Sequence, residues 1–219
     1  MIYVYAIAEA PSLAVEPVER GLGDARLRVH VCDGLAAVFS NHRTLRPEPT
    51  PDALWRHEAV VERLMAHAAV LPLRFGTMLR RVEELSAFLR DHGDDLAEGI
   101  ERVRGRVELG VRVLGEPPRQ RPHGEGSGRE YLMARRDAHH RAERTAGEVH
   151  EPLAAVAHEA RLRTPGAPPT ILAGAYLVDR GAVDAFKARV SALAAARQDV
   201  SVVCTGPWPP YSFVPESRP

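Results

Sequence analysis

The sequence contains few of the residues that would assign it to a cysteine-based class of proteins. It has two cysteines, Cys32 and Cys204, each inside a short apolar run. It has no CxxC pair and no Cys/His cluster with the spacing of a zinc site. Nothing in this context supports a disulfide or a zinc fold. Both thiols are expected to be buried and reduced.

Net charge is also lacking, because 29 Lys and Arg residues balance 29 Asp and Glu residues. General binders of nucleic acid usually carry a basic excess, so nucleic acid is not favoured as the main partner. A net charge near zero gives little repulsion between molecules, which is compatible with self-association or a permanent partner. The apolar content of 45% is typical of a globular protein.

Long apolar runs are absent as well. The longest clean run, ILAGAYLV, is far shorter than the ~20 residues that span a bilayer. The N-terminus, MIYVYAIAEAP, lacks the basic region and apolar stretch of a signal peptide. We therefore expect a soluble cytoplasmic protein.

The first half of the chain mixes strand and helix signals. Asp33-Gly34 separates two strand-like runs and predicts a tight hairpin, since glycine accepts a positive φ. Thr50-Pro51-Asp52 predicts a helix start. Pro72 cannot donate a ladder hydrogen bond, so its strand should lie at an edge or a bulge. The predicted strands are 2–8, 26–32, 35–40, 70–76 and 106–114. The predicted helices are 52–69 and 82–103, the second interrupted at His92-Gly93-Asp94.

The second half begins after a segment rich in Pro, Gly and charge, at 115–128, which predicts a linker. A long helical segment is predicted over 129–162, with Pro152 kinking or splitting it. Its small and apolar residues at a spacing of seven suggest a helical hairpin or coiled coil. A strand (170–178), a helix (182–197) and a strand (199–205) are predicted to follow.

This order of elements predicts an α+β fold with two domains. Residues 1–114 can be folded as a modified ferredoxin-like domain. Residues 129–219 should form a C-terminal α+β domain with the long helix, ending in a Pro-rich aromatic segment, Trp208–Phe213, which we name the terminal strap.

Candidate catalytic and metal-binding motifs are incomplete. His57-Glu58 and His158-Glu159 each match the first half of a zinc-protease motif, but neither has the second histidine on the same helical face. We interpret both pairs as surface or partly buried polar residues of helices. The sequence predicts no catalytic residue, no metal site and no cofactor, and hence no enzyme.

Two segments are unusual for a generic domain. In LPLRFGT, Arg74 interrupts an apolar strand and is expected to pair with a carboxylate. In the terminal strap, prolines hold the chain extended, so that Trp208, Tyr211 and Phe213 can pack with little loss of entropy. The strap either seals its own domain or offers an aromatic face to a partner.

The start IYVYAIAE, the helix with His57 and Glu58, the block LPLRFGT and the terminal TGPWPPYSF occur in this order from Ile2 to Phe213. Together they resemble the gas vesicle protein L/F family. The resemblance implies two α+β domains, the first a modified ferredoxin-like one, and no enzymatic activity. It also implies an accessory or minor structural protein of gas vesicles, which binds the hydrophobic, GvpA-like shell protein and other accessory proteins during assembly.

Our hypothesis for the mechanism is that a sheet edge or an apolar groove covers the shell subunit before assembly. An edge strand would allow β-augmentation, in which backbone hydrogen bonds give affinity. The candidate contact residues lie in the predicted edge strand and in the terminal strap: Leu71, Leu73, Arg74, Phe75, Trp208, Tyr211 and Phe213.

Two alternatives remain open at this point. A ferredoxin-like domain can also serve as a small enzyme or ligand-binding sensor, in which His57 and Glu58 would perform acid/base chemistry. The Arg-rich linker could instead bind nucleic acid. The pattern of residues does not give the oligomeric state.

Overall fold

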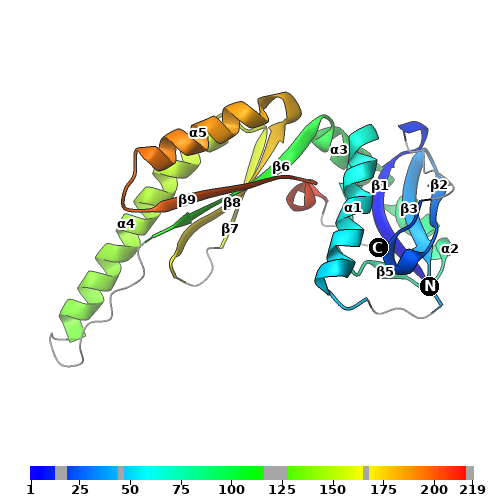
Figure 1. The fold of residues 1–219 in the computed structure, drawn as a ribbon, viewed down its shortest axis with the longest axis horizontal. Coiled ribbons are helices and arrows are strands. Elements are labelled where there is room, and N and C mark those ends of the chain that lie inside the picture. The colour runs from blue at the N-terminus through cyan, green and yellow to red at the C-terminus, as the bar shows by residue number, and fades with distance from the viewer. Residues whose placement is uncertain (13–18, 44–46, 116–127, 165–167, 216–219) are drawn as a thin grey trace. The chain divides into compact units, whose positions relative to one another are not determined.

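The computed structural model describes residues 1–12, 19–43, 47–115, 128–164 and 168–215 and shows the mixed α+β fold that the sequence predicts (Figure 1). The strands are β1 (Ile2–Glu9), β2 (Leu27–Cys32), β3 (Leu35–Asn41), β4 (Val70–Pro72), β5 (Met78–Leu79), β6 (Arg106–Leu114), β7 (Glu159–Arg163), β8 (Thr170–Asp179) and β9 (Ser201–Trp208). The α-helices are α1 (Pro51–His67), α2 (Val82–Asp91), α3 (Gly93–Val103), α4 (Gly128–Ala154) and α5 (Val183–Ala195). None of these helices is long and apolar enough to cross a membrane.

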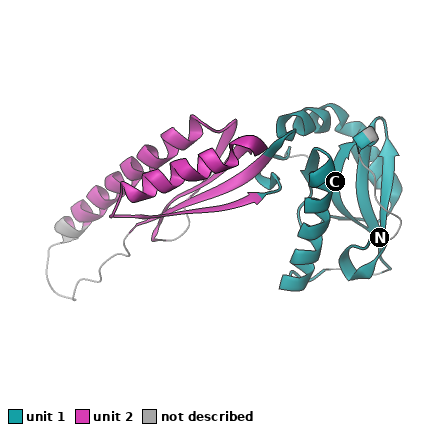
Figure 2. Cartoon of the chain, turned by 45° about the horizontal axis from the view of Figure 1, so that its top comes forward, with its two compact units in different colours: residues 1–106, 208–219 teal, residues 107–207 magenta. Residues whose placement is uncertain are grey.

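The chain divides into two compact units (Figure 2). Unit 1 comprises residues 1–106 together with the C-terminal residues from Trp208, and unit 2 comprises residues 107–207. The boundaries differ from the expected ones because β6 joins the sheet of unit 2 and the terminal strap buries its side chains in unit 1. Of the strap side chains, Phe213 is fully buried, whereas Trp208 stays 40% exposed. Of the expected linker, 116–127 lies outside the described residues. In sequence, unit 2 is therefore an insertion into unit 1.

The sheet of unit 1 has the strand order β2-β3-β1-β4, and β5 also pairs with β1. The β2–β3 hairpin is confirmed: Asp33 and Gly34 have φ values of 47° and 81°, and Cys32 pairs with Leu35 across the turn. Strand β4 lies at the end of the sheet order, as Pro72 predicted. It pairs with β1 in an antiparallel register.

A β-bulge in β1 determines which side chains face α1. The pairing of β1 with β3 shifts between Val4 and Ala6, so Tyr5 is the extra residue. Because of the bulge, Tyr3, Tyr5, Ala6 and Ala8 all enter the same apolar cluster, although strict alternation would put Tyr5 and Ala6 on opposite faces. Tyr3 and Tyr5, two positions apart, face α1 by ordinary alternation, and the bulge adds Ala6 and Ala8 to the same face.

The helices of unit 1 cover both faces of its sheet. Helix α1 packs Val60, Val61 and Leu64 on the face that carries the tyrosines, and α2 and α3 pack on the other face (Figure 1). A ferredoxin-like domain has its two helices on one face, so this description is not confirmed for unit 1.

Unit 2 has the order β6-α4-β7-β8-α5-β9 and the sheet order β7-β8-β6-β9. Val149 and Leu153 of α4 share one apolar cluster with Phe186 and Val190 of α5, so both helices lie on the same face. This βαββαβ order with both helices on one face is the split-βαβ pattern that the sequence had suggested for unit 1.

The prediction of helix over 129–162 is wrong beyond Ala154. Helix α4 continues two residues past Pro152 and ends in a turn, in which Ala157 N donates to the carbonyl of Leu153. The chain then forms β7, which pairs with β8 in antiparallel register. This strand was missed because EARLR carries three charges and follows the helix without a Gly or Pro boundary.

Candidate functional site

The buried stripe of α1 begins with a histidine. Thr50 caps the helix by accepting a hydrogen bond from Ala53 N, and Pro51 occupies the first turn. The buried positions that follow are His57, Val60, Val61 and Leu64, a helical spacing that turns one face to the sheet. His57 is only 2% exposed, so the expectation of a surface or partly buried residue understated its burial.

The hydrogen bonds of His57 determine its tautomer. Its Nε2 lies 3.0 Å from the carbonyl oxygen of Leu73, which can only accept, so Nε2 carries the proton. Nδ1 is then an acceptor, and the hydroxyl of Tyr3 donates to it at 2.9 Å. The Tyr3 oxygen in turn accepts a hydrogen bond from Gly76 N. His57 is therefore neutral, and both of its ring nitrogens are engaged within the protein.

The terminal strap enters the same network through Tyr211. The Tyr211 hydroxyl lies 3.2 Å from Nε2 of His57 and donates to Oε2 of Glu58 at 2.9 Å. The hydroxyl thus bridges two consecutive residues of α1. We name this set of side chains, Tyr3, His57, Glu58 and Tyr211, the latch network.

Burial governs the protonation of the latch network. It lowers the pKa of His57 to about 4, and the hydrogen bond to the Leu73 carbonyl only partly opposes this shift. Burial also raises the pKa of Tyr3, and burial together with the neighbouring Glu58 carboxylate raises the pKa of Tyr211. His57, Tyr3 and Tyr211 are consequently uncharged at neutral pH.

A second branch of hydrogen bonds fixes the other tyrosine of β1. The Tyr5 hydroxyl accepts from Leu22 N at 2.7 Å and lies 2.9 Å from Oγ of Ser40. Ser40 in turn lies 2.8 Å from Nε2 of His42. The Tyr5 ring stacks on the His57 ring with centroids 5.6 Å apart. These hydrogen bonds fix the position of the Tyr5 ring, against which the His57 ring packs.

The strap continues around the edge of the sheet. Phe213 is completely buried, and Pro215 lies against α3, where a Cβ added at Gly99 would come within 2.9 Å of the Pro215 ring and 3.3 Å of Leu71. Since α1 and α3 lie on opposite faces, the segment from Tyr211 to Pro215 passes the edge at β4. The strap therefore seals unit 1, which is one of the two roles the sequence left open.

The predicted contact residues divide by exposure. Leu71, Leu73 and Phe213 are buried, and Phe75 and Tyr211 are half-buried. Arg74 lies beyond the end of β4 at Pro72 and is exposed to solvent. Contrary to expectation, it forms no ion pair with a carboxylate in the described part of the chain. Trp208 is 40% exposed. The two predicted segments do meet, since Leu73 and Tyr211 both contact His57.

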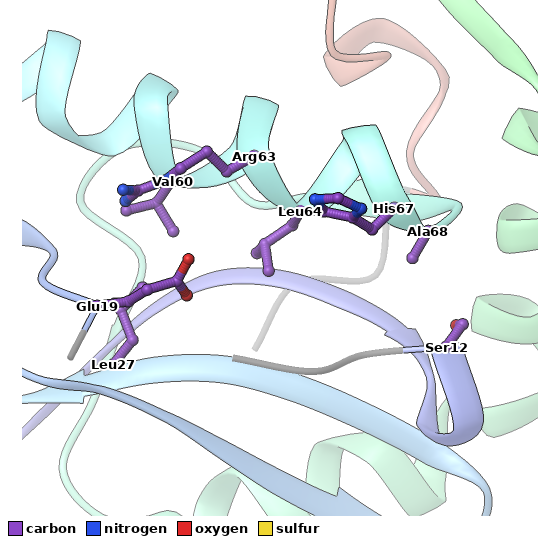
Figure 3. Close-up of a pocket in the computed structure, with 8 residues that line it drawn as sticks. All are labelled: Ser12, Glu19, Leu27, Val60, Arg63, Leu64, His67 and Ala68. Carbon is purple, nitrogen blue, oxygen red and sulfur yellow. The ribbon is translucent and has the colours of Figure 1, made fainter. Parts of the chain in front are cut away.

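A small cavity of about 90 Å³ lies beside α1, away from the latch network (Figure 3). Helix α1 contributes Val60, Arg63, Leu64 and His67 to its lining, Ala68 follows at the end of the helix, and Ser12, Glu19 and Leu27 complete it. Pockets for small organic molecules measure about 300–1,000 Å³, so this one accommodates little more than water. Within the described ranges, no three His, Cys, Asp or Glu side chains are grouped to hold a metal ion.

The sequence did not identify Tyr3, Tyr5 or Gly99 as important residues. The available signal was a pair of tyrosines two positions apart in an otherwise apolar strand, which places two hydroxyls on one buried face. For Gly99, a glycine inside an amphipathic helix indicates close approach of another segment.

Comparison with known proteins gives a consistent result over almost the whole chain. The model of the family described as "Gas vesicle synthesis protein GvpL/GvpF" matches residues 1–215. Gas vesicle protein F2 of Halobacterium salinarum is 30% identical over 217 residues, which cover 97% of this chain and 91% of that protein. Gas vesicle protein L of a Streptomyces species is 34% identical over 184 residues, covering 74% and 68%.

Two crystal structures share the fold. Gas vesicle protein GvpF from Anabaena sp. PCC7120 aligns with a TM-score of 0.85 at 21% identity, covering 99% of this chain and 97% of that one. GvpF from Microcystis aeruginosa aligns with a TM-score of 0.81 at 18% identity, covering 98% of each chain.

Proposed function

Since the chain belongs to the GvpL/GvpF family of gas vesicle synthesis proteins, we propose that it is an accessory or minor structural protein of gas vesicles. In this role it binds the hydrophobic, GvpA-like shell protein and other accessory proteins in the cytoplasm during assembly. It acts by binding and not by catalysis: both ring nitrogens of His57 are already hydrogen-bonded inside unit 1.

The observation that carries this proposal is the exposed indole of Trp208, the first residue of the terminal strap, whose following residues are anchored in unit 1. Trp208 is 40% exposed, whereas Pro209 and Pro210, which follow it, are buried. An indole that is held in place loses little entropy when it binds, and tryptophan is enriched at the centres of interfaces.

The other predicted residues fall into two groups in this proposal, those that contact the partner directly and those that support the contact surface. Arg74, at the surface, and Phe75 and Tyr211, half-buried, are proposed as direct contacts with the partner. Leu71, Leu73 and Phe213 are buried and support the contact surface from the core.

Co-purification tests the proposal. Tagged protein is co-expressed with the shell protein, and the amount of shell protein that stays soluble and elutes with the tag is measured. Trp208→Ala is expected to reduce the recovered shell protein by about tenfold, the loss typical of an interface tryptophan. Circular dichroism checks that the variant is folded. If the wild-type protein retains no shell protein while both are soluble, direct shell binding is wrong.

A further inference from the structure

The first half of helix α4 has no buried face in the described part of the chain. The buried residues of this helix, Val149 and Leu153, lie near its C-terminal end, where they join the apolar cluster of unit 2. From Leu132 to Arg141 every residue is exposed, so about three turns of helix have all sides in solvent. Figure 1 shows this part of α4 extending beyond the strands of unit 2. We name residues 129–144 the α4 arm.

The α4 arm is basic along one face. It carries five arginines against three acidic residues. Arg129, Met133, Arg136, His140 and Arg144 follow one another at intervals of three or four residues, which places them on the same side of the helix. All five are exposed. Within the described residues, neither Arg129 nor Arg144 forms an ion pair.

The ion pairs inside the α4 arm give it little support. Arg136 lies 3.6 Å from Asp137, and His139 and His140 each lie 3.3 Å from Glu143. All of these side chains are exposed, and exposed pairs contribute little to stability. A helix that is polar on all sides depends on many such pairs or on a neighbour that it contacts. The arm therefore presents its basic face to a partner.

A patch of the opposite charge lies in unit 1, where α2 ends and α3 begins. These two helices carry seven acidic residues against two arginines. Asp91, Asp94 and Asp95, which we name the acidic corner, are exposed and form no ion pair in the described part of the chain. Asp94 and Asp95 complement the dipole of α3 from its first turn. Asp91 lies in the last turn of α2, where the dipole of that helix disfavours a carboxylate, so α2 itself does not account for it.

We propose that the α4 arm of one copy of this protein docks on the acidic corner of a second copy. The arginines of the arm then meet the three aspartates, and charge complementarity determines which surfaces come together. The occupant is a second copy because each chain carries both patches, while its net charge is zero. Two copies therefore attract each other patch to patch without repulsion between the whole molecules. This self-docking goes beyond the proposed function and does not involve the shell protein.

The test is sedimentation velocity of the purified full chain at low salt, over a range of protein concentrations. The wild type should self-associate, and about 1 M salt, where the Debye length falls to about 3 Å, should dissociate it. The arm variant, Arg129→Glu with Arg144→Glu, places like charges against the acidic corner. The corner variant, Asp91→Lys with Asp94→Asn, does the same against the arm. Each should weaken self-association by at least about tenfold.

A mixture of the two variants tests whether these two surfaces meet. The intact arm of the corner variant faces the intact corner of the arm variant, and the two altered patches are themselves of opposite charge. An equimolar mixture should therefore associate again, although each variant alone does not. Arg112→Glu with Arg189→Glu is the matched control, because it reverses two other exposed arginines of unit 2. It should associate like the wild type.

Three results would overturn the self-docking. The first is a wild-type chain that stays monomeric at low salt, and the second is a pair of folded variants that associate like the wild type. The third is a monomeric chain that shifts labelled duplex DNA and loses the shift in the arm variant, which would assign the arm to nucleic acid. If circular dichroism shows that a double variant is poorly folded, Arg144→Glu or Asp91→Lys alone replaces it.

Discussion

The hydroxyl of Tyr211 lies 2.9 Å from Oε2 of Glu58, although 153 positions separate the two residues in the sequence. The same hydroxyl lies 3.2 Å from Nε2 of His57, which is hydrogen-bonded to Tyr3 and to the carbonyl of Leu73. One tyrosine thus connects the terminal strap to the first strand, the first helix and the segment after β4.

Tyr211→Phe tests the latch network. It removes the donor to a carboxylate while keeping the ring, so we expect the free energy of unfolding to fall by about 1–3 kcal/mol. Urea denaturation measures the loss. Tyr176→Phe is a control in unit 2, where the hydroxyl lies 2.9 Å from Nδ1 of the His150 ring rather than from a carboxylate, and should cost about 1 kcal/mol or less. A loss for Tyr211→Phe no larger than for this control would contradict the role of Glu58.

The stability of the protein should fall in mild acid because of His57. Its pKa is about 4 in the folded protein and 6.5 when unfolded, so the unfolded state binds more protons between these values. The contribution is fully present above about pH 6.5 and is lost as the pH falls toward 4, a change of about 3 kcal/mol. The lowered pKa of His42 acts in the same direction. Protonation of His57 at Nδ1 also places an N–H donor against the Tyr3 oxygen, which already accepts a hydrogen bond from Gly76 N.

Urea denaturation between pH 7.5 and 4.5 would measure this dependence in His57→Gln and in the wild type. The variant should be less stable at pH 7 but should lose less stability on acidification. His67→Gln, at an exposed histidine of the same helix, is the matched control for the loss of a histidine side chain. Identical slopes for His57→Gln and the wild type would show that His57 is protonated equally in both states.

Gly99→Ala tests the path of the strap. Alanine normally stabilises a helix interior relative to glycine by up to about 1 kcal/mol. Here the added Cβ would come within 2.9 Å of the Pro215 ring, so we expect a net loss of about 1–3 kcal/mol. Gly147→Ala in α4 is the matched control, because its nearest neighbour would be Glu151 Oε1 at 3.9 Å. It should be neutral or stabilising, and equal effects of the two substitutions would argue against the contact with Pro215.

The two ends of the strap should respond differently to truncation. Phe213 is completely buried, so Phe213→Ala should reduce stability by about 3–5 kcal/mol. Trp208→Ala should cost about 1 kcal/mol or less, because its indole is partly in solvent. Thermal unfolding of both variants measures the contribution of each side chain to stability, and the recovery of shell protein measures its contribution to binding. A Trp208→Ala variant as unstable as Phe213→Ala would assign the indole to the core.

The parts of the fold that depend on neighbouring residues could be predicted from the sequence. Asp33-Gly34 determines its hairpin because the turn needs a positive φ at those positions. Thr50 and Pro51 determine the start of α1 through local capping. The family could also be predicted, because its characteristic sequence segments occur in the same order from Ile2 to Phe213.

The remaining parts depend on contacts between distant segments. The sequence did not predict the five residues of β7 as a strand, so the split-βαβ order of unit 2 was not evident. The ferredoxin-like pattern was therefore expected in unit 1. The burial of His57 could not be read from α1, because its partners Tyr3, Leu73 and Tyr211 come from three other segments. The helical spacing of apolar residues in α1 does not indicate which distant residues hydrogen-bond to His57.

The insertion of unit 2 into unit 1 affects the order in which the chain can fold as it is synthesised. Unit 2 is complete once Pro207 has been made, whereas unit 1 still lacks the residues that pack on α1 and α3. At about 5–20 residues per second, the 153 positions from Glu58 to Tyr211 take about 8–30 s to translate. During that interval the outer edge of β4 lacks the strap, and Glu58 has not met Tyr211. The residues that close unit 1 therefore come after the whole of unit 2 in the order of synthesis.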